Sequence, residues 1–502
     1  MAILLSGLLS ELAKNSIKYE TFLPDGCDPA SIELGGMVCD SRKAGPGVMF
    51  AATKGDHSDA HEFTAQAVSA GAPALLCERR CAAAVPQIII PDVRSGMGEV
   101  ASVIHGYPSK KMTMFAVTGT NGKTTSAFLT RAILASAGVK AGLAGTVIND
   151  DGEKKEEAEH TTSEGADLQG LLARMVENGC GACVMEASSH SIAQGRISGI
   201  SFDRIGFTNL TPEHLEYHTD MENYFSAKRA LFGKYMKDDG IAAINIDDEY
   251  GMRLRRELGK RAVSYSMRKE EADFFARVLS VSEEGLAIEV KAPGLSGNKG
   301  IKLPALGAYN VMNALQAFSL ACAAGVPAAA AIESLEAMPQ VPGRLERYRL
   351  DNGVTCVIDF AHTSDGLEKA LGAVRQVCGG RLYVVFGLGG ERDISRRPIV
   401  GETASRLGDY VVVTSDNPRG EDPEAIIAGI EPGVKRHATP YKLITDRREA
   451  ICLALDMASA GDIVVIAGRG PETRQVFKDF SIPLVDREIM EDWCRMRGRR
   501  VL

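Results

Sequence analysis

The stretch from Ala116 to Thr125 constrains the fold of this chain more than any other part of its sequence. An apolar run ends at Thr118, a turn contains Gly119 and Gly122, and Lys123 opens a segment with a helical pattern. Glycines let consecutive backbone N–H groups turn toward an anion, and the start of a helix adds a favourable dipole. A lysine supplies positive charge, and a threonine hydroxyl can bind Mg²⁺. The order of strand, glycine turn and helix therefore predicts a nucleotide triphosphate site.

The spacing of this turn departs from the common phosphate loop. Only Thr120 and Asn121 separate the two glycines, whereas the common loop has four residues between them. The alternative is a glycine turn that merely joins a strand to a helix. Such a turn would not require Gly-Lys-Thr at the helix start, so we interpret the segment as a shortened phosphate loop.

Length and composition predict a three-domain protein of the cytoplasm. The 502 residues exceed what one hydrophobic core usually supports. We expect an N-terminal domain over residues 1–107, a central domain over 108–340 and a C-terminal domain over 341–502, with a linker near residues 107–111. A net charge of −8 without a basic run argues against a nucleic-acid surface. The first residues resemble an amphipathic helix rather than a targeting signal.

Two sequence features could suggest other classes of protein. The 11 cysteines are scattered and suit reduced thiols. Cys180 and Cys183 form a CxxC pair, but Cys183 begins an apolar run and is expected in a buried strand rather than a redox or zinc site. Residues 303–332 carry no charge, yet Pro304 and Pro327 and several amides would be unfavourable in lipid. We predict a buried helix, a turn and a second helix there, with no membrane insertion.

The remaining pattern predicts an α/β fold. In the central block, apolar runs near residues 114–118, 183–186, 205–209 and 241–246 alternate with amphipathic helices, which is typical of a mostly parallel sheet covered on both faces. A second, Rossmann-like α/β pattern follows, with runs near 354–360, 382–387, 410–414 and 463–467. Ligands of such sheets gather beyond the carboxyl ends of the strands. That rule selects the phosphate loop, residues 186–190 and residues 209–214.

Several polar clusters occupy these positions. Glu186, with Ser188 and His190 shortly after it, is a plausible Mg²⁺ and substrate station, although serines that cap a strand end would look the same. A lone histidine such as His214 is usually structural. Lys228 reads, on composition alone, as a solvated helix lysine. Arg419 follows another strand and offers a planar fork for a carboxylate, or is simply solvated in a turn.

Taken in order, the motifs resemble those of the Mur ligases of peptidoglycan synthesis, in particular the type that adds a diamino acid. The motifs are Gly119 to Thr124, Glu186 to His190, Asn209 to His214, Asp359 to His362 and Asp416 to Arg419. The resemblance covers essentially the whole chain. It implies an ATP- and Mg²⁺-dependent amide ligase, a monomer, that joins meso-diaminopimelate to UDP-N-acetylmuramoyl-L-alanyl-D-glutamate through an acyl phosphate. It also implies that the N-terminal domain binds the UDP part of that substrate.

The same resemblance assigns roles to residues by position. ATP would contact Gly119, Thr120, Asn121, Gly122, Lys123, Thr124, Thr125, Asn310 and Asp359. Lys123, Glu186, His214 and Lys228 would be catalytic, and Mg²⁺ would be held by Thr124, Glu186, His214 and Lys228, the last as a carbamate. The UDP-muramoyl substrate would contact Ser41, Asp56, His57, Ser58, Thr161, Thr162, Ser188, Gln194 and Arg196. The incoming amino acid would contact Arg392, Asp416, Asn417, Pro418, Arg419, Gly468 and Glu472.

The choice of amino acid rests on Arg419. Meso-diaminopimelate has a distal carboxylate that a guanidinium can bind through two hydrogen bonds, whereas lysine presents an ammonium there. Three residues depart from the pattern of the family: Arg469 replaces the usual Lys, Pro471 a common His, and Ser364 a usual Pro. Addition of lysine or another diamino acid is one alternative. A folylpolyglutamate synthase-like ligase and a nucleotide-dependent switch that does not ligate are two others.

Overall fold

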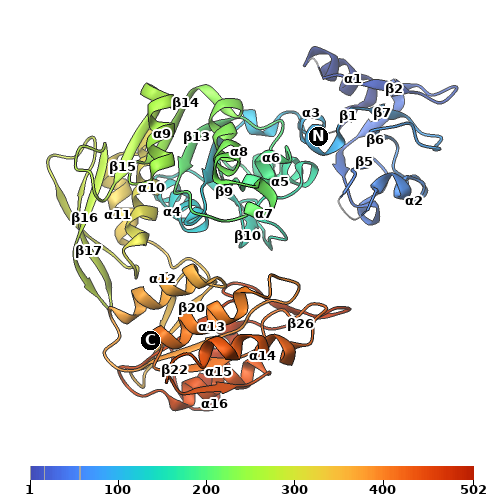
Figure 1. Cartoon of the computed structure of the whole chain (residues 1–502). Helices are drawn as coiled ribbons and strands as arrows, with labels where there is room; N and C mark the ends of the chain where they lie inside the picture. The colour runs from blue at the N-terminus through green and yellow to red at the C-terminus, as the bar shows by residue number, and fades with distance from the viewer. Residues whose placement is uncertain (1, 16, 56–57) are drawn as a thin grey trace. The chain divides into compact units, whose positions relative to one another are not determined.

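The computed structural model describes residues 2–15, 17–55 and 58–502. By its internal contacts the chain forms two compact units. The first contains residues 1–275, 291–296 and 312–334, and the second contains residues 276–290, 297–311 and 335–502. Figure 1 labels the helices and strands and colours the chain from the N-terminus to the C-terminus. The domain boundaries at residues 107 and 340 stay predictions.

The N-terminal part of the first unit is a small α/β layer. Its five-stranded sheet has the order β2-β7-β6-β5-β4, and only the pairing of β2 with β7 is antiparallel. The strands are β2 (Glu20–Phe22), β4 (Gly36–Val38), β5 (Val48–Ala51), β6 (Leu75–Cys77) and β7 (Gln87–Ile89). A short pair, β1 (Ile3–Leu4) with β3 (Glu33–Leu34), and the helices α1 (Leu5–Lys14), α2 (Thr64–Ser69) and α3 (Val93–Ile104) complete it.

The segment that we expected to be a linker is instead a packed turn. Pro108 and Ser109 are buried, and the Ser109 hydroxyl donates to the Gly199 carbonyl at 3.3 Å. Helix α3 lies so close to the same turn that a Cβ on Gly98 would be 2.6 Å from the Ser198 carbonyl oxygen. A flexible linker would leave these groups to water. The prediction of a linker at residues 107–111 was therefore wrong in its structural sense.

A large sheet is the centre of the fold. Its order is β11-β10-β9-β12-β8-β13-β14-β15-β16-β17-β18, and the pairs from β9 to β16 are parallel, as the sequence pattern predicted. The inner strands are β8 (Thr113–Thr118), β9 (Ala141–Ala144), β12 (Ala182–Glu186), β13 (Phe202–Phe207), β14 (Met236–Asn245) and β15 (Ala262–Ser266). The outer ones are β10 (Ile148–Asp150), β11 (Lys155–Glu157), β16 (Phe274–Ser282), β17 (Gly285–Lys291) and β18 (Lys299–Leu303).

Helices cover both faces of this sheet. One face buries Met114 and Ala116 of β8 in a core shared with α5 (Gly165–Glu177), α8 (Met221–Lys234) and α9 (Glu249–Leu258). On the other, α4 (Lys123–Ser136) packs on β8, β9 and β12, and α10 (Tyr309–Ala323) approaches Gly206. The short helices α6 (Ser189–Ala193) and α7 (Leu215–His218) follow strand ends, and α11 (Ala328–Glu336) follows α10. The predicted helix, turn and start of another helix within residues 303–332 are therefore confirmed.

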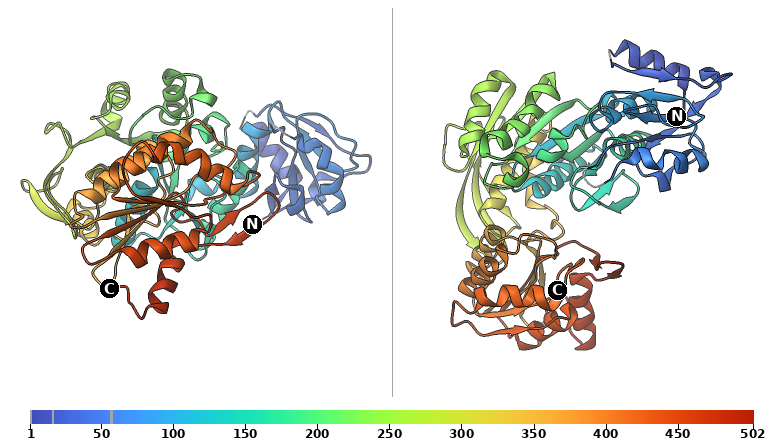
Figure 2. Two further views of the ribbon diagram at one scale, coloured as in Figure 1. Left: turned by 60° about the horizontal axis from the view of Figure 1, so that its bottom comes forward. Right: turned by 45° about the vertical axis from the view of Figure 1, so that its right-hand side comes forward.

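The second unit has its own six-stranded sheet, in the order β19-β20-β24-β21-β22-β23. The strands are β19 (Glu346–Arg349), β20 (Thr355–Asp359), β21 (Leu382–Phe386), β22 (Tyr410–Val413), β23 (Tyr441–Leu443) and β24 (Ile463–Ala467). One face packs against α12 (Ser364–Arg375), α13 (Arg396–Leu407) and α14 (Pro423–Val434), and the other against α15 (Arg447–Met457) and α16 (Asp486–Met496) (Figure 2). A hairpin of β25 (Arg474–Val476) and β26 (Ser481–Pro483) stands apart from this sheet.

A buried ion pair ties these helices to the sheet. The Asp486 carboxylate of α16 accepts from Nε and Nη2 of Arg447, both at 2.7 Å, and both side chains are fully buried. Nη2 of Arg447 also donates to the carbonyl of Ala467, the last residue of β24. The pair therefore joins the first turns of α15 and α16 to the carboxyl end of a central strand.

We predict that Arg447→Met lowers the free energy of unfolding of this unit by about 3 to 5 kcal/mol, because it leaves the Asp486 carboxylate buried without its cation. Trp493 of α16, the one tryptophan of the sequence, is buried and reports the transition by fluorescence during urea unfolding. In the control, Lys369→Met removes the exposed pair of Lys369 with Asp365, which should cost less than about 0.5 kcal/mol. Equal effects of the two variants would contradict the assignment.

Candidate active site

The phosphate loop lies at the carboxyl end of β8 and begins α4. Gly119 and Gly122 have φ of 141° and 87°, a region that favours glycine. A Cβ on Gly119 would lie 1.8 Å from Oγ1 of Thr208, and one on Gly122 would lie 2.3 Å from Oδ1 of Asn313. Two independent reasons therefore favour glycine at both positions: the backbone conformation, and the lack of space for a side chain.

The loop is fixed by the segment that follows the neighbouring strand β13. The backbone N–H of Thr120 donates to the Asn209 carbonyl at 2.8 Å, and that of Asn121 donates to Oδ1 of Asn209 at 3.0 Å. Nζ of Lys123 lies 3.0 Å from the Gly119 carbonyl and 2.8 Å from the Thr120 carbonyl. No role was predicted for Asn209 from the sequence, although this residue begins the motif from Asn209 to His214.

Glu186 ends β12 and lies beside the loop. Its Oε2 accepts from the Thr124 hydroxyl at 3.0 Å, so two of the four predicted metal ligands meet directly. The carboxylate also accepts from the backbone N–H of Thr146 at 2.8 Å and from the Thr146 hydroxyl at 3.0 Å. Thr146 was not predicted from the sequence. Its position just after the strand β9 was the signal that could have found it.

Lys228 is buried at this site, contrary to the reading of a solvated lysine from composition. Its side chain is 1% exposed, and Nζ donates to the Gly119 carbonyl at 2.9 Å. Burial, and then the positive charge of Lys123, hold the pKa of Lys228 well below its usual value. This environment favours the neutral, nucleophilic form of the amine over the ammonium.

Two histidines, His190 and His214, follow the strands β12 and β13. The ring centroids of His190 and His214 are 4.7 Å apart, and His214 is about two fifths exposed. Burial and the neighbouring imidazoles lower the pKa of His190 to about 4. The 214 side chain pairs with Glu216 at 3.5 Å and with Glu213 at 3.9 Å. Within the described residues, no group of three His, Cys, Asp or Glu side chains is arranged to hold a metal ion.

The donors present nevertheless suit Mg²⁺. This ion prefers oxygen ligands and usually keeps several waters, taking one or two carboxylates together with substrate phosphates. The Thr124 hydroxyl and the Glu186 carboxylate provide such oxygens next to a phosphate loop. A full cage of protein ligands is therefore unnecessary, and the donor set fits the ion.

Five of the predicted substrate contacts come together near Glu186. The buried Thr162 hydroxyl donates to the Glu186 carbonyl at 2.8 Å and accepts from the Ser188 N–H at 3.3 Å. Arg196 donates to the Thr162 carbonyl at 3.1 Å and to Oε1 of Gln194 at 3.0 Å. The Thr161 hydroxyl accepts from that of Thr146 at 3.2 Å.

The other predicted substrate contacts fall between residues 41 and 58 of the sequence. Ser41 begins a short helical turn, and its hydroxyl donates to Oε1 of Gln66 at 3.1 Å. Ser58 is exposed. Asp56 and His57 lie outside the described residues.

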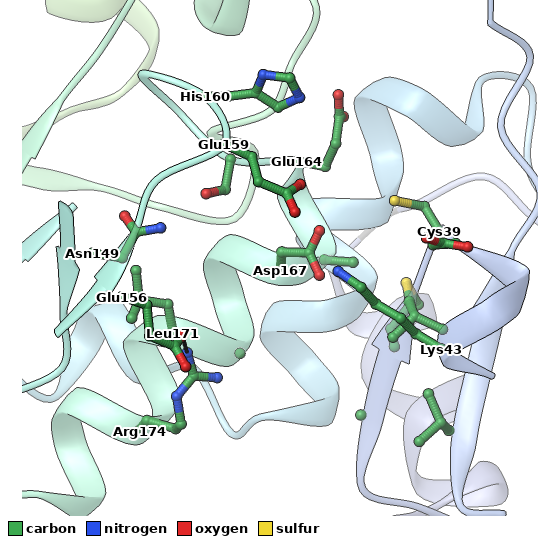
Figure 3. A pocket seen from close by; sticks show the side chains of 18 of the residues that line it. Cys39, Lys43, Asn149, Glu156, Glu159, His160, Glu164, Asp167, Leu171 and Arg174 are labelled. Carbon is green, nitrogen blue, oxygen red and sulfur yellow. Dashed lines mark ion pairs between the residues drawn. The ribbon is translucent and has the colours of Figure 1, made fainter. Parts of the chain in front are cut away.

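A pocket of about 510 Å³ is lined by residues of β4 and α5 (Figure 3). Its lining includes Asp40, the residue before Ser41, and Ser163, the residue after Thr162. Lys43 and Asp167 point toward one another in it. Its charged lining comprises the cations Lys43 and Arg174 and the acids Asp40, Glu156, Glu157, Glu159, Glu164 and Asp167. This excess of carboxylates disfavours a diphosphate in the pocket itself.

The second unit holds the remaining predicted contacts. Asn310 is buried on α10, and its amide donates to the Leu306 carbonyl at 2.7 Å. Asp359 ends β20, accepts from the N–H groups of Leu345 at 2.7 Å and Ala361 at 2.8 Å, and has a pKa raised by burial. Arg392 is fully on the surface of the loop after β21.

The predicted amino-acid contacts otherwise gather at the ends of β22 and β24. Nδ2 of Asn417 donates to Oε2 of Glu472 at 2.7 Å. A Cβ on Gly468 would lie 2.8 Å from Oδ2 of Asp416, so the two loops touch. Pro418 is buried, and Arg419 has φ of 52° and donates through Nη1 to the Gly390 carbonyl at 2.7 Å. These contacts build one pocket edge from two strand ends.

Comparison with known proteins gives consistent matches. The model of the Mur ligase middle domain matches residues 117–321, and that of the Mur ligase glutamate ligase domain matches residues 343–470. UDP-N-acetylmuramoyl-L-alanyl-D-glutamate--2,6-diaminopimelate ligase 1 of Clostridium acetobutylicum is 38% identical over 95% of this chain and 98% of its own length. The ligase of that activity from Chlorobaculum tepidum is 40% identical over 93% of each chain. A solved structure of such a ligase is 31% identical, with a TM-score of 0.66 over 95% of this chain and 98% of its own.

We predict that Gly122→Ala weakens ATP binding by at least about tenfold, measured by calorimetry. The new methyl group must displace Asn313 and the residue must hold a positive φ, which together cost more than about 1.4 kcal/mol. The matched control is Gly138→Ala at the other end of α4, where φ is 82° and no atom lies within 4 Å of the added Cβ. If both variants weaken binding alike, the steric argument fails.

Proposed function

The chain belongs to the Mur ligase family and is an ATP-dependent amide ligase, and we propose that it joins meso-diaminopimelate to UDP-N-acetylmuramoyl-L-alanyl-D-glutamate. The observation that carries this proposal is the arrangement of Glu186, Thr124 and Lys228 around a phosphate loop, in a chain aligned over nearly its full length with ligases of that name. The product would be a precursor of peptidoglycan.

The chemistry follows from the poor reactivity of a carboxylate toward amines. The γ-phosphoryl group of ATP passes to the carboxylate oxygen of the substrate's D-glutamate, which gives an acyl phosphate and ADP. The amine of diaminopimelate then attacks the acyl carbon, phosphate leaves, and an amide and one proton result. The loop N–H groups and the Lys123 ammonium offset the charge that develops on the transferred phosphoryl group.

We propose that Mg²⁺ is bound by Thr124 and Glu186, with His214 and a carbamate on Lys228 as further ligands; when bound, it supplies positive charge that neutralises the phosphate oxygens. The substrate dipeptide would lie against Thr161, Thr162, Ser188, Gln194 and Arg196. Arg196 already has one carboxylate partner, Glu164 at 3.0 Å, and can offer its other donors to the substrate. The UDP part would bind at Ser41 and Ser58 of the N-terminal part.

The carbamate on Lys228 has a physical basis in its burial. A neutral amine adds to CO₂ and releases one proton, which gives an anionic carbamate; starting from the ammonium cation, two protons are released in all. Burial and the neighbouring Lys123 charge lower the pKa of Lys228, which favours the neutral amine that this addition needs. An anion at this position would face Lys123, whose charge otherwise repels an ammonium there.

The pocket for the amino acid would be formed by Asp416, Asn417, Arg419 and Glu472. Among the described residues, the Arg419 guanidinium donates to the Gly390 carbonyl through Nη1, so the rest of its donor fork can bind the distal carboxylate of diaminopimelate. We place the protein in the cytoplasm, where ATP and UDP-linked precursors occur. None of the helices in the described part of the chain is long and apolar enough to cross a bilayer.

The first test is turnover of the purified protein with ATP and the UDP-muramoyl dipeptide. We predict amide product by mass with meso-diaminopimelate and little with L-lysine. Arg419→Ala should raise the KM for diaminopimelate by roughly ten- to a hundredfold, because charge-assisted hydrogen bonds to its carboxylate are lost. Arg406→Ala, which removes an exposed pair with Glu368, is the control. Equal or better use of lysine would overturn the choice of diamino acid.

The second test concerns Lys228. In the presence of ¹³C-bicarbonate we predict a protein carbamate signal by NMR that disappears on acidification and is missing in Lys228→Ala. That variant should also lose at least about a hundredfold in kcat. Lys234→Ala, at the last turn of the same helix, serves as the control and should keep both signal and activity. A signal that persists without Lys228 would contradict the assignment.

A further inference from the structure

Arg469 is a buried cation that the proposed chemistry does not use. It follows β24, its side chain is fully buried, and its Nε has no hydrogen-bond partner among the described residues. Nη1 donates to Oδ1 of Asn417 at 2.8 Å, and Nη2 donates to the carbonyls of Arg474 at 2.8 Å and Leu484 at 3.1 Å. A charge at this depth is costly, so its contacts indicate what it stabilises.

The contact with Asn417 determines which way that amide points. A guanidinium can only donate hydrogen bonds, so the atom facing it must be the amide oxygen. The same oxygen accepts from the Val476 N–H at 2.9 Å, which uses both of its acceptor sites. Nδ2 therefore faces Glu472 and donates to its Oε2 at 2.7 Å.

The hairpin of β25 and β26 holds the same loop from its other side. Gln475 is buried, and its Nε2 donates to the Asp416 carbonyl at 2.6 Å and to the Ser415 hydroxyl at 3.1 Å. The Arg419 N–H donates to the Val476 carbonyl at 3.0 Å. Residues 415–419 are thus bonded to one strand of the hairpin by side chains and backbone alike.

Two features show that this loop needs such support. Arg419 holds a positive φ of 52°, which is uncommon for a residue with a side chain. Glu472 also lies near Asp416, and burial together with that neighbouring carboxylate raises the pKa of Glu472. Arg469, 3.5 Å from Glu472, offsets this repulsion, as does the charge of Arg419.

We propose that Arg469 is a positioning residue for amino-acid recognition: it orients Asn417 and, with Gln475, clamps the loop that presents Arg419. This inference rests on the proposed ligase function. It assigns to Arg469 and the hairpin an effect on the amino-acid substrate, because in the described part of the chain the side-chain hydrogen bonds of Arg469 and Gln475 reach Ser415, Asp416, Asn417 and the hairpin's own residues.

The test uses the full chain and steady-state kinetics with each of the three substrates varied. Arg469→Met should raise the KM for the amino acid by about ten- to a hundredfold, the usual range for loss of a charged hydrogen bond, and leave the KM values for ATP and the UDP-muramoyl dipeptide within about twofold. Arg469→Lys keeps a cation that can still donate to Asn417, and should restore the amino-acid KM to within about fivefold of the original.

The matched control is Arg474→Met. Arg474 lies in the same hairpin, but it is exposed and its guanidinium donates within the hairpin, to the hydroxyl and carbonyl of Ser481. It should leave all three KM values unchanged. If Arg469→Met does not fold, as thermal unfolding would show, Gln475→Leu tests the same clamp and should raise the amino-acid KM about two- to tenfold.

The outcomes separate the two proposals. No amide product from the unaltered protein with any diamino acid would refute the ligase function, and the clamp with it. An active protein in which Arg469→Met folds without a change in the amino-acid KM, or raises all three KM values equally, would overturn the clamp alone. So would a Gln475→Leu variant with an unchanged amino-acid KM.

Discussion

The parallel pairing of β8 between β12 and β13 is the constraint on which the active site depends. Val117 lies opposite Glu186, and Thr118 lies opposite Phe207, so the chain leaves all three strands at the same edge of the sheet. The phosphate loop, the carboxylate and the Asn209 segment then meet without any adjustment of their own. The bonds from Asn209 to the loop show that the second strand end shapes the first. A nucleotide site built this way is as rigid as the sheet that carries it.

The sequence predicted the elements that form continuous apolar runs and missed those that depend on packing. Runs such as Leu382–Phe386 and Ile463–Ala467 are uniformly apolar because helices cover both faces of the sheet, and such runs are recognisable without a structure. The hairpin β25–β26 contains mixed polar and apolar residues and lies outside the six-stranded sheet. Its sequence therefore shows no periodic pattern from which the hairpin could be predicted. The packed turn at residues 108–110 was read as a linker because Pro, Ser and Lys look the same in both settings. Its burial comes from contacts with residues about 90 positions away in the sequence, such as Gly199.

The site shows the same division. Gly119, Gly122 and Lys123 form a local pattern, so the phosphate loop was visible directly. Thr146 and Asn209 contact the site only because the order of the strands places them beside Glu186 and the phosphate loop. The order of strands in a sheet cannot be predicted from any short segment of sequence. Lys228 is the sharpest case, because a lysine flanked by Ala and Arg on a helix has every local mark of solvent exposure. Its burial follows from where α8 packs against the sheet, and only the resemblance to a family suggested it.

Two buried cations illustrate how side-chain chemistry decides what a buried charge can do. Lys228 can lose its proton, and burial with Lys123 nearby favours that loss. Its buried amine therefore needs no permanent anionic partner, and it can be converted to an anionic carbamate. Arg469 keeps its proton at any physiological pH, so the surroundings must supply acceptors instead. These acceptors are the amide oxygen of Asn417 and two backbone carbonyls. The hydrogen bond to Arg469 fixes the orientation of the Asn417 amide. Lys228 is thus suited to a position where the charge of the side chain changes. Arg469 is suited to a position where a fixed cation holds the Asn417 amide in one orientation.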